Sequence, residues 1–184
     1  SHISIYAVPA GETDTNLLTL TPTLSGILDN MEFVIDYSLE ASIPAILKTK
    51  TDFKGVYMRS LGGESIRKFL SENLEEGTIP DYSDEKEIQK AVISRIAANQ
   101  LRLKTGDRID TYFISDDVRV RRLEIAGIFN SHFDTYDGIY IYGALPLIQQ
   151  LGGIGEKQGT SLMIHTDDFN RVGEYSDEIR ATLN

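Results

Sequence analysis

Two predicted strands that are separated by only three residues constrain the fold of this chain most. The first runs from Arg108 to Ile114 and the second from Val118 to Phe129. Ser115, Asp116 and Asp117 lie between them, and turns favour these residue types. A connection this short joins neighbouring antiparallel strands, so the sequence predicts a β-hairpin.

The rest of the chain supplies separate strands and helices. Further strands are predicted over residues 3–8, 33–50 with a break near 42–44, 53–59, 139–142 and 160–166, with a polar turn over 9–15. Helices are predicted over residues 21–30, 64–74, 84–101, 144–151 and 172–183. The helix from Asp84 is the most clearly marked, because Asp84 and Glu87 have capping-box spacing and apolar residues recur along one side. Hairpins mixed with separate helices are typical of an α+β fold.

Composition removes several classes of function. The 184 residues suit one large domain or two small ones. The formal net charge of −10 argues against a nucleic-acid partner and against electrostatic docking on anionic lipid. The absence of cysteine excludes disulfides, zinc-thiolate sites and thiol nucleophiles. No apolar run reaches the roughly 18 residues that a membrane span needs.

The residues that could carry chemistry do not form a recognisable site. His2, His132 and His165 are far apart in the sequence, and no pair has the spacing of metal ligands. Asp134 and Asp137 superficially resemble a calcium loop, but the EF-hand spacing is not met. An enzyme would require scattered acids such as these two to converge in a pocket. The sequence therefore predicts no catalytic residue, no cofactor and no metal ligand.

The second half of the chain carries an ordered set of family motifs. Residues 93–107, ISRIAANQLRLKTGD, resemble the pattern G..LA..L.LK.GD.I, and residues 123–129 are similar to F.VVGIF. Residues 133–142, 145–151 and 161–183 resemble the motifs that follow in the same order. Together they resemble the extracytoplasmic domain, also called the MacB-like periplasmic core, of FtsX-like, LolC/LolE and MacB-type ABC transporter permeases. The agreement extends from about residue 88 to 184, whereas the first 87 residues match only loosely.

The resemblance implies an architecture and a location. In this family the domain lies between the first two transmembrane helices, on the periplasmic face of the bacterial inner membrane. A mixed α/β subdomain, called Porter, would comprise residues 1–57 and 134–184, and an inserted, mainly β subdomain, called Sabre, residues 58–133. This chain would then be a soluble fragment of a membrane protein.

The resemblance also implies partners. A cytoplasmic ATPase subunit or domain would supply energy, and a second permease subunit and a periplasmic protein are further expected partners. The domain itself would do no chemistry. It would transmit conformational change, handle substrate or dock a partner.

The predicted hairpin departs from one branch of the family. LolC-type proteins carry at this place a long extended arm, the hook, which recruits the lipoprotein carrier LolA. Here Ser115, Asp116 and Asp117 alone connect the two strands, which leaves little room for a hook. These three residues are the candidate partner-contact site, and a role in lipoprotein release is not expected.

The main alternative is a periplasmic ligand-binding or adhesion module that is unrelated to transport. Hydrophobic spans encoded directly before and after the chain would favour the transporter, because that domain lies between two membrane helices. An enzyme is the third alternative, and it depends on Asp134 and Asp137 forming a pocket.

Overall fold

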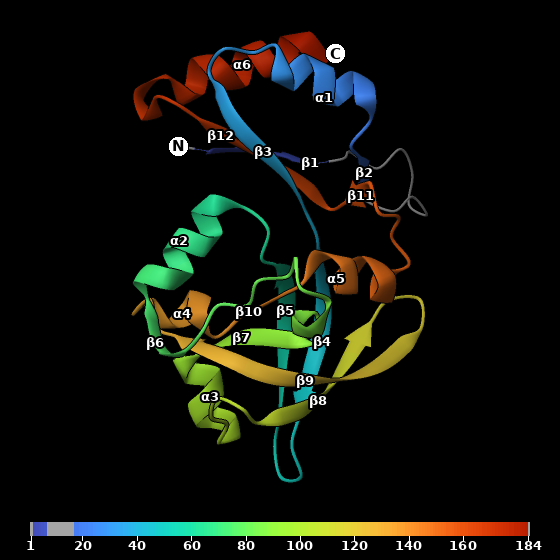
Figure 1. Ribbon diagram of the computed structural model, residues 1–184, viewed down its shortest axis with the longest axis vertical. Coiled ribbons are helices and arrows are strands. Elements are labelled where there is room, and N and C mark those ends of the chain that lie inside the picture. The colour runs from blue at the N-terminus through green and yellow to red at the C-terminus, as the bar shows by residue number, and fades with distance from the viewer. Residues whose placement is uncertain (1, 7–16, 184) are drawn as a thin grey trace. The chain divides into compact units, whose positions relative to one another are not determined.

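The computed structural model describes residues 2–6 and 17–183, and its contacts divide the chain into two compact units (Figure 1). The first unit comprises residues 1–40 and 157–184, and the second comprises residues 41–156. The chain therefore crosses between the units twice, at residues 40–41 and 156–157. The polar turn predicted over residues 9–15 lies outside the described residues.

The first unit is built on a three-stranded antiparallel sheet. Its strand order is β1 (His2–Tyr6), β12 (Ser161–Thr166) and β3 (Val34–Glu40). The helices are α1 (Pro22–Asp29) and α6 (Val172–Leu183), and the smaller elements are β2 (Leu18–Thr19), β11 (Gln158–Gly159) and the 3₁₀ turn η2 (Phe169–Arg171). Leu162 and Ile164 of the central strand are fully buried against Leu28 of α1 and Ile179 of α6. The alternating residues Met163 and His165 are half-buried, as the period of a strand requires.

An aromatic stack anchors α6 in this unit. The rings of Phe33 and Tyr175 are parallel, with centroids 4.1 Å apart. The Tyr175 hydroxyl donates a hydrogen bond of 3.0 Å to the carboxylate of Asp167. Burial and this hydrogen bond raise the pKa of Tyr175. The hydroxyl therefore remains protonated and holds the helix to the segment that precedes it.

The second unit is a closed ring of six strands. They are β4 (Ser42–Lys48), β5 (Phe53–Ser60), β7 (Lys90–Ser94), β8 (Arg108–Ile114), β9 (Val118–Phe129) and β10 (Tyr140–Gly143). Hydrogen-bonded neighbours follow the order β9, β7, β10, β5, β4, β8, and β8 pairs again with β9. The twelve-residue strand β9 makes this closure (Figure 1). Its residues 118–124 pair with β8 and its residues 124–129 pair with β7.

The interior of the ring is the main core of the unit. Met58, Phe113 and Leu123 are fully buried in it. Its other elements are β6 (Leu74–Gly77), which extends the sheet beside β9, the helices α2 (Glu64–Glu72), α3 (Arg95–Leu101), α4 (Asp134–Asp137) and α5 (Leu145–Gly152), and the 3₁₀ turn η1 (Glu85–Glu87). Helices α3 and α5 add buried apolar residues to the same core. Helix α2 instead packs Leu70 on Val92 and Phe129, and so covers part of the outside of the ring.

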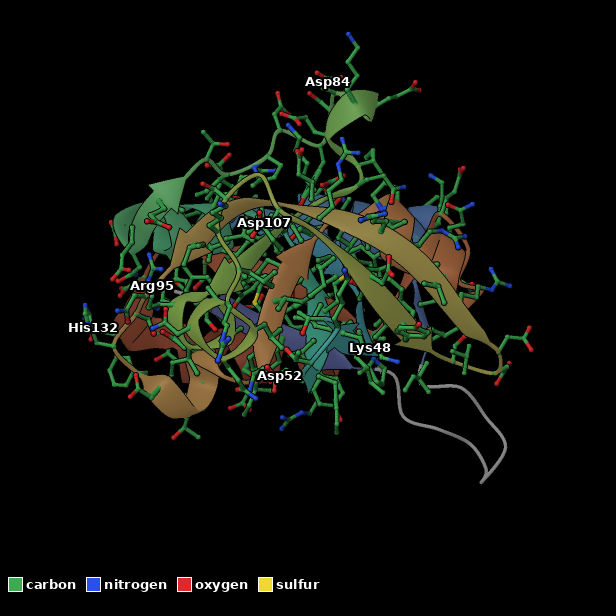
Figure 2. All side chains as sticks on the ribbon, turned by 90° about the horizontal axis from the view of Figure 1, so that it is seen from below. Lys48, Asp52, Asp84, Arg95, Asp107 and His132 are labelled. Atoms are coloured by element: carbon green, nitrogen blue, oxygen red, sulfur yellow. The ribbon has the colours of Figure 1, made fainter. Side chains whose placement is uncertain are left out.

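The structure confirms the α+β class and the hairpin, but the long helix predicted over residues 84–101 is wrong. The segment folds as η1, then strand β7, then the short helix α3, and Figure 2 shows Asp84 and Arg95 on separate elements. Residues 91–94 are buried on both faces of β7, so apolar residues recur without strand alternation and imitate a helical stripe. Ser94 ends the strand and begins the helix, because its Oγ accepts a hydrogen bond of 3.1 Å from the Ala97 amide.

The unit boundaries differ from those that the family resemblance implied. The division falls at residues 40–41 and 156–157, whereas the resemblance implied 57–58 and 133–134. Strand β4 is hydrogen-bonded to β5 and β8, and β10 to β5, so these segments belong to the ring.

Hydrogen exchange can test this division. Leu123→Ala removes a fully buried side chain from the ring core and should cost about 2–5 kcal/mol. Exchange should then accelerate in β4 and β10 as well as in β9, because all three share one core. Leu162→Ala in the first unit should leave β4 and β10 protected. Acceleration of β4 and β10 by Leu162→Ala, and not by Leu123→Ala, would instead support the boundaries predicted from the sequence.

Candidate interaction surface

The hairpin tip that the sequence singled out is held against the ring. Strands β8 and β9 stay paired up to Ile114 and Val118, so residues 115–117 alone form the connection. The Ser115 amide donates a 3.2 Å hydrogen bond to the Asp117 carbonyl. The Ser115 hydroxyl lies 3.2 Å from the same carbonyl and 3.3 Å from the carbonyl of Leu151 in α5. The Arg119 guanidinium also donates to α5, at the Gln150 carbonyl (3.2 Å). The tip is therefore a short turn fastened to α5, with Asp116 and Asp117 exposed.

The outer side of the same strands forms an exposed apolar surface, which we call the outer β-face. Strand pairing places Val120 opposite Tyr112, Tyr112 beside Ile46, and Ile46 opposite Gly55. In the adjacent row Ile114 lies opposite Val118, which is 65% exposed. On β5, Phe53 and Tyr57 flank Gly55 on the same side and are 72% and 49% exposed. The outer β-face comprises Ile46, Phe53, Tyr57, Tyr112, Ile114, Val118 and Val120, with Gly55 among them.

The four strands that carry the outer β-face are basic in an otherwise acidic chain. Strands β4, β5, β8 and β9 contain seven Lys or Arg and two Asp or Glu, which is a net charge of +5. Three of the basic residues, Lys54, Arg119 and Arg121, alternate to the inner side, so the outer side has a net charge of +2. The whole chain has a net charge of −10, so the residues outside these four strands carry −15. A row formed by Arg122, Asp110 and Lys48 borders the apolar residues on one side.

Gly55 lies in the middle of β5, where glycine has no local structural purpose. Its register with β4 is continuous, and its φ is outside the left-handed region. A Cβ added there would meet no atom within 4 Å. Glycine weakens a strand interior, so Gly55 lowers the stability of β5, and no contact within the chain requires a glycine there.

Two of the three histidines lie in the first unit and one in the second. The backbones of His2 and His165 are opposite each other in the β1–β12 pair, and His165 Nδ1 lies 3.8 Å from an Asp36 carboxylate oxygen. His132 belongs to the other unit and has a positive φ of 65°. Within residues 2–6 and 17–183, no group of three or more His, Asp or Glu side chains is placed to hold a metal ion.

The two acids considered for catalysis have different surroundings. Asp137 is buried, and its carboxylate accepts hydrogen bonds from the amide and the hydroxyl of Ser131. It thereby fixes the turn that leads into α4. Asp134 is exposed at the start of the same short helix. Both residues are thus accounted for by local structure: one holds a turn, and the other is a solvated first-turn acid.

Sequence reasoning missed a polar network beside β6. Arg95 Nε lies 2.7 Å from a carboxylate oxygen of Glu75, and Arg95 Nη2 lies 3.2 Å from Glu76. Asn130 donates a 2.9 Å hydrogen bond to the other Glu75 oxygen. These two hydrogen bonds to Glu75, the one from Arg95 being the stronger effect, lower the pKa of the Glu75 carboxyl. Its partners are 20 and 55 residues away, so no sequence spacing could have identified the network.

Comparison with known proteins identifies the fold. No protein-family model matches the sequence, and no curated protein matches it. The extracellular domain of the noncanonic ABC-type transporter YknZ from Gram-positive bacteria is similar in structure, with 12% identity and a TM-score of 0.68. That alignment covers 100% of this chain and 93% of the YknZ domain. The periplasmic region of MacB from Actinobacillus actinomycetemcomitans has 11% identity and a TM-score of 0.63, over 99% of this chain and 81% of that one.

The chain has the fold of the YknZ and MacB extracytoplasmic domains. This confirms the fold that the motifs in the second half predicted, and it extends the likeness to the first 87 residues. None of the described helices has the length and apolar character of a membrane span.

Two glycines of the ring give opposite predictions for substitution by alanine. Gly55→Ala should stabilise the protein by about 0.5–1 kcal/mol, because the new Cβ meets open space in a strand. Gly127→Ala should destabilise it by about 1–3 kcal/mol, because its Cβ would lie 2.5 Å from the Thr78 carbonyl oxygen. Urea unfolding measures both changes. A loss of stability on Gly55→Ala would show that this glycine has a structural role within the chain.

The network at Glu75 predicts a contribution to acid stability. Because the folded pKa of Glu75 lies below its ordinary value of 4.5, the network stabilises the protein above that pH and ceases to do so as the pH falls through the folded pKa. Glu75→Gln should therefore reduce the fall in melting temperature between pH 5 and pH 2. Arg95→Gln removes the main cause of the pKa shift, so it should also reduce the fall in melting temperature between pH 5 and pH 2. The double variant should reduce this fall little more than either single variant does. Additive effects of the two substitutions would contradict the coupling.

Proposed function

We propose that this chain is a non-catalytic extracytoplasmic domain of an ABC transporter permease subunit, located on the periplasmic face of the bacterial inner membrane. The observation that carries the proposal is the likeness over the whole chain to two domains described as extracellular or periplasmic parts of ABC transporters. The ordered motifs between residues 88 and 184 support it independently, since they belong to the sequence alone.

In this proposal the domain couples ATP hydrolysis in a cytoplasmic ATPase subunit to conformational change outside the membrane. Both described ends of the chain, His2 and Leu183, belong to the first unit, which would be the unit attached to the membrane segments. Ala41 alone separates β3 of the first unit from β4 of the second. A displacement of β3 would therefore pass to β4 through a connection that has very little slack.

The two units correspond, in this proposal, to Porter and Sabre. Residues 1–40 and 157–184 would be Porter, and the ring of residues 41–156 would be Sabre. The resemblance also implies a second permease subunit and a periplasmic protein as partners. The hairpin tip bears on the choice among family members, because Ser115 is hydrogen-bonded to Asp117 and to Leu151 of α5. We therefore propose a role in efflux or mechanical coupling in preference to lipoprotein release through a hook.

The location can be tested by cysteine labelling, because the chain contains no cysteine of its own. The coding sequence on both sides of the chain should encode apolar spans of about 20 residues. In the full-length protein, Lys68→Cys on the exposed side of α2 should react with a membrane-impermeant maleimide in intact spheroplasts. Labelling that occurs only after lysis would contradict the location.

The coupling has its own measurement. Spin labels at Lys68→Cys in the second unit and Glu178→Cys in the first report the distance between the units. Their distance distribution should change when the cognate ATPase binds ATP, whereas a control pair within the ring, Lys68→Cys with Lys104→Cys, should not change. If the distribution between the units is the same with and without ATP, the coupling proposal is wrong even where the location is correct.

A further inference from the structure

We propose that the outer β-face is a docking surface for a partner protein that presents apolar side chains together with acidic ones. The proposal rests on the strands themselves and does not depend on the transport function. It also moves the candidate contact site from the hairpin tip, Ser115 to Asp117, to the outer side of the same hairpin and of β4 and β5.

The first reason is that the exposed apolar residues are contiguous. Single exposed hydrophobic residues are ordinary, but a continuous group marks an interaction site. Here Val120, Tyr112 and Ile46 are consecutive neighbours across three strands, and Val118 and Ile114 form the next row. Elsewhere on the ring the outward apolar residues are covered: Leu70 of α2 packs on Val92 and Phe129. In the described part of the chain, Val118 and Phe53 have no comparable cover and remain 65% and 72% exposed.

The second reason is Gly55. A mid-strand glycine ordinarily reflects a bulge, a positive φ, internal crowding or the close approach of another molecule. The first three are absent at Gly55, because its register is continuous, its φ is ordinary and no atom lies within 4 Å of a built Cβ. The remaining explanation is an external partner that approaches the backbone between Phe53 and Tyr57. A side chain at this position would hold that partner away from the surface.

The third reason is charge, and it selects the occupant. The side chains that alternate to the outer side of the four strands include Lys48, Arg59, Arg108 and Arg122 with Asp110 and Glu124, a net charge of +2 within a chain of −10. The surface therefore attracts acidic groups locally. A second copy that used the same face would bring two basic surfaces together, which is unfavourable. An anionic membrane is a plane wider than this face, so the net charge of −12 on all the other residues would oppose it. A protein that covers only the outer β-face avoids both penalties.

The dimensions of the face indicate a transient contact. Four strands spaced about 4.8 Å apart, each followed over a length of about six residues, span roughly 19 Å by 20 Å, or about 400 Å². Stable complexes bury about 800 Å² on each partner, and signalling or transfer encounters bury less. A partner that binds with a dissociation constant of tens of micromolar and dissociates readily suits an area of this size.

Site-specific photo-crosslinking in the native cell tests the proposal. In the full-length protein, p-benzoylphenylalanine replaces Val118 or Tyr57 on the outer β-face, or Lys68 on α2 as the control position. The two outer positions should crosslink to the same heterologous protein, at a segment that contains both acidic and apolar residues, and Lys68 should not. Adding Gly55→Glu should reduce the yield at Val118 at least tenfold, because it places bulk and negative charge against the partner. The matched variant Gly173→Glu, which also projects into open space, should leave the yield unchanged.

Four outcomes would overturn the proposal. They are a crosslink to a second copy of this chain, a lipid adduct together with sedimentation of the chain on phosphatidylglycerol vesicles, a yield that Gly55→Glu leaves unchanged, and no crosslink above the Lys68 control. The melting temperature of Gly55→Glu, measured beside that of Gly173→Glu, separates loss of docking from loss of folding. If Gly55→Glu lowers it, Gly55→Ser serves as the second variant and should still reduce the yield.

Discussion

The pairing of β9 with two different strands is the interaction on which the second unit depends. Residues 118–124 of β9 bond to β8 and residues 124–129 bond to β7, so one strand closes the ring. Closure satisfies the backbone groups of the ring strands and encloses a single apolar core. It also fixes which side chains point outward, because each register is set by neighbours on both sides.

Closure limits how a partner can bind. An open sheet offers unpaired strand edges, whereas a closed ring does not. The added strand β6 is only four residues long, and its Glu75 and Glu76 are paired with Arg95, so it is a poor template for another strand. Recognition of this unit must then use side chains on its outer surface. Part of that surface is covered by α2, and the outer β-face is exposed.

The sequence predicted the features that depend on local residues. The hairpin was predicted because Ser115, Asp116 and Asp117 favour a turn between two strands, and the α+β class followed from the mixture of elements. The helix from Asp84 failed because Ala91, Val92 and Ile93 are buried on both faces of β7, which removes the alternation that identifies a strand. Ring closure, the Glu75 network and the outer β-face all depend on register between distant segments. A single sequence does not contain that register.

The charge of the chain shows why an average over the whole molecule can mislead. A net charge of −10 argues against a large anionic partner, because such a partner meets the field of the entire chain. It does not describe the outer side of β4, β5, β8 and β9, which has a net charge of +2. Charges are screened over about 8 Å in physiological salt, so a small partner meets only the residues beneath it. The distribution therefore favours binding of an acidic protein that covers a small area. Copies of the chain repel each other through their net negative charge, whereas the outer β-face attracts acidic groups.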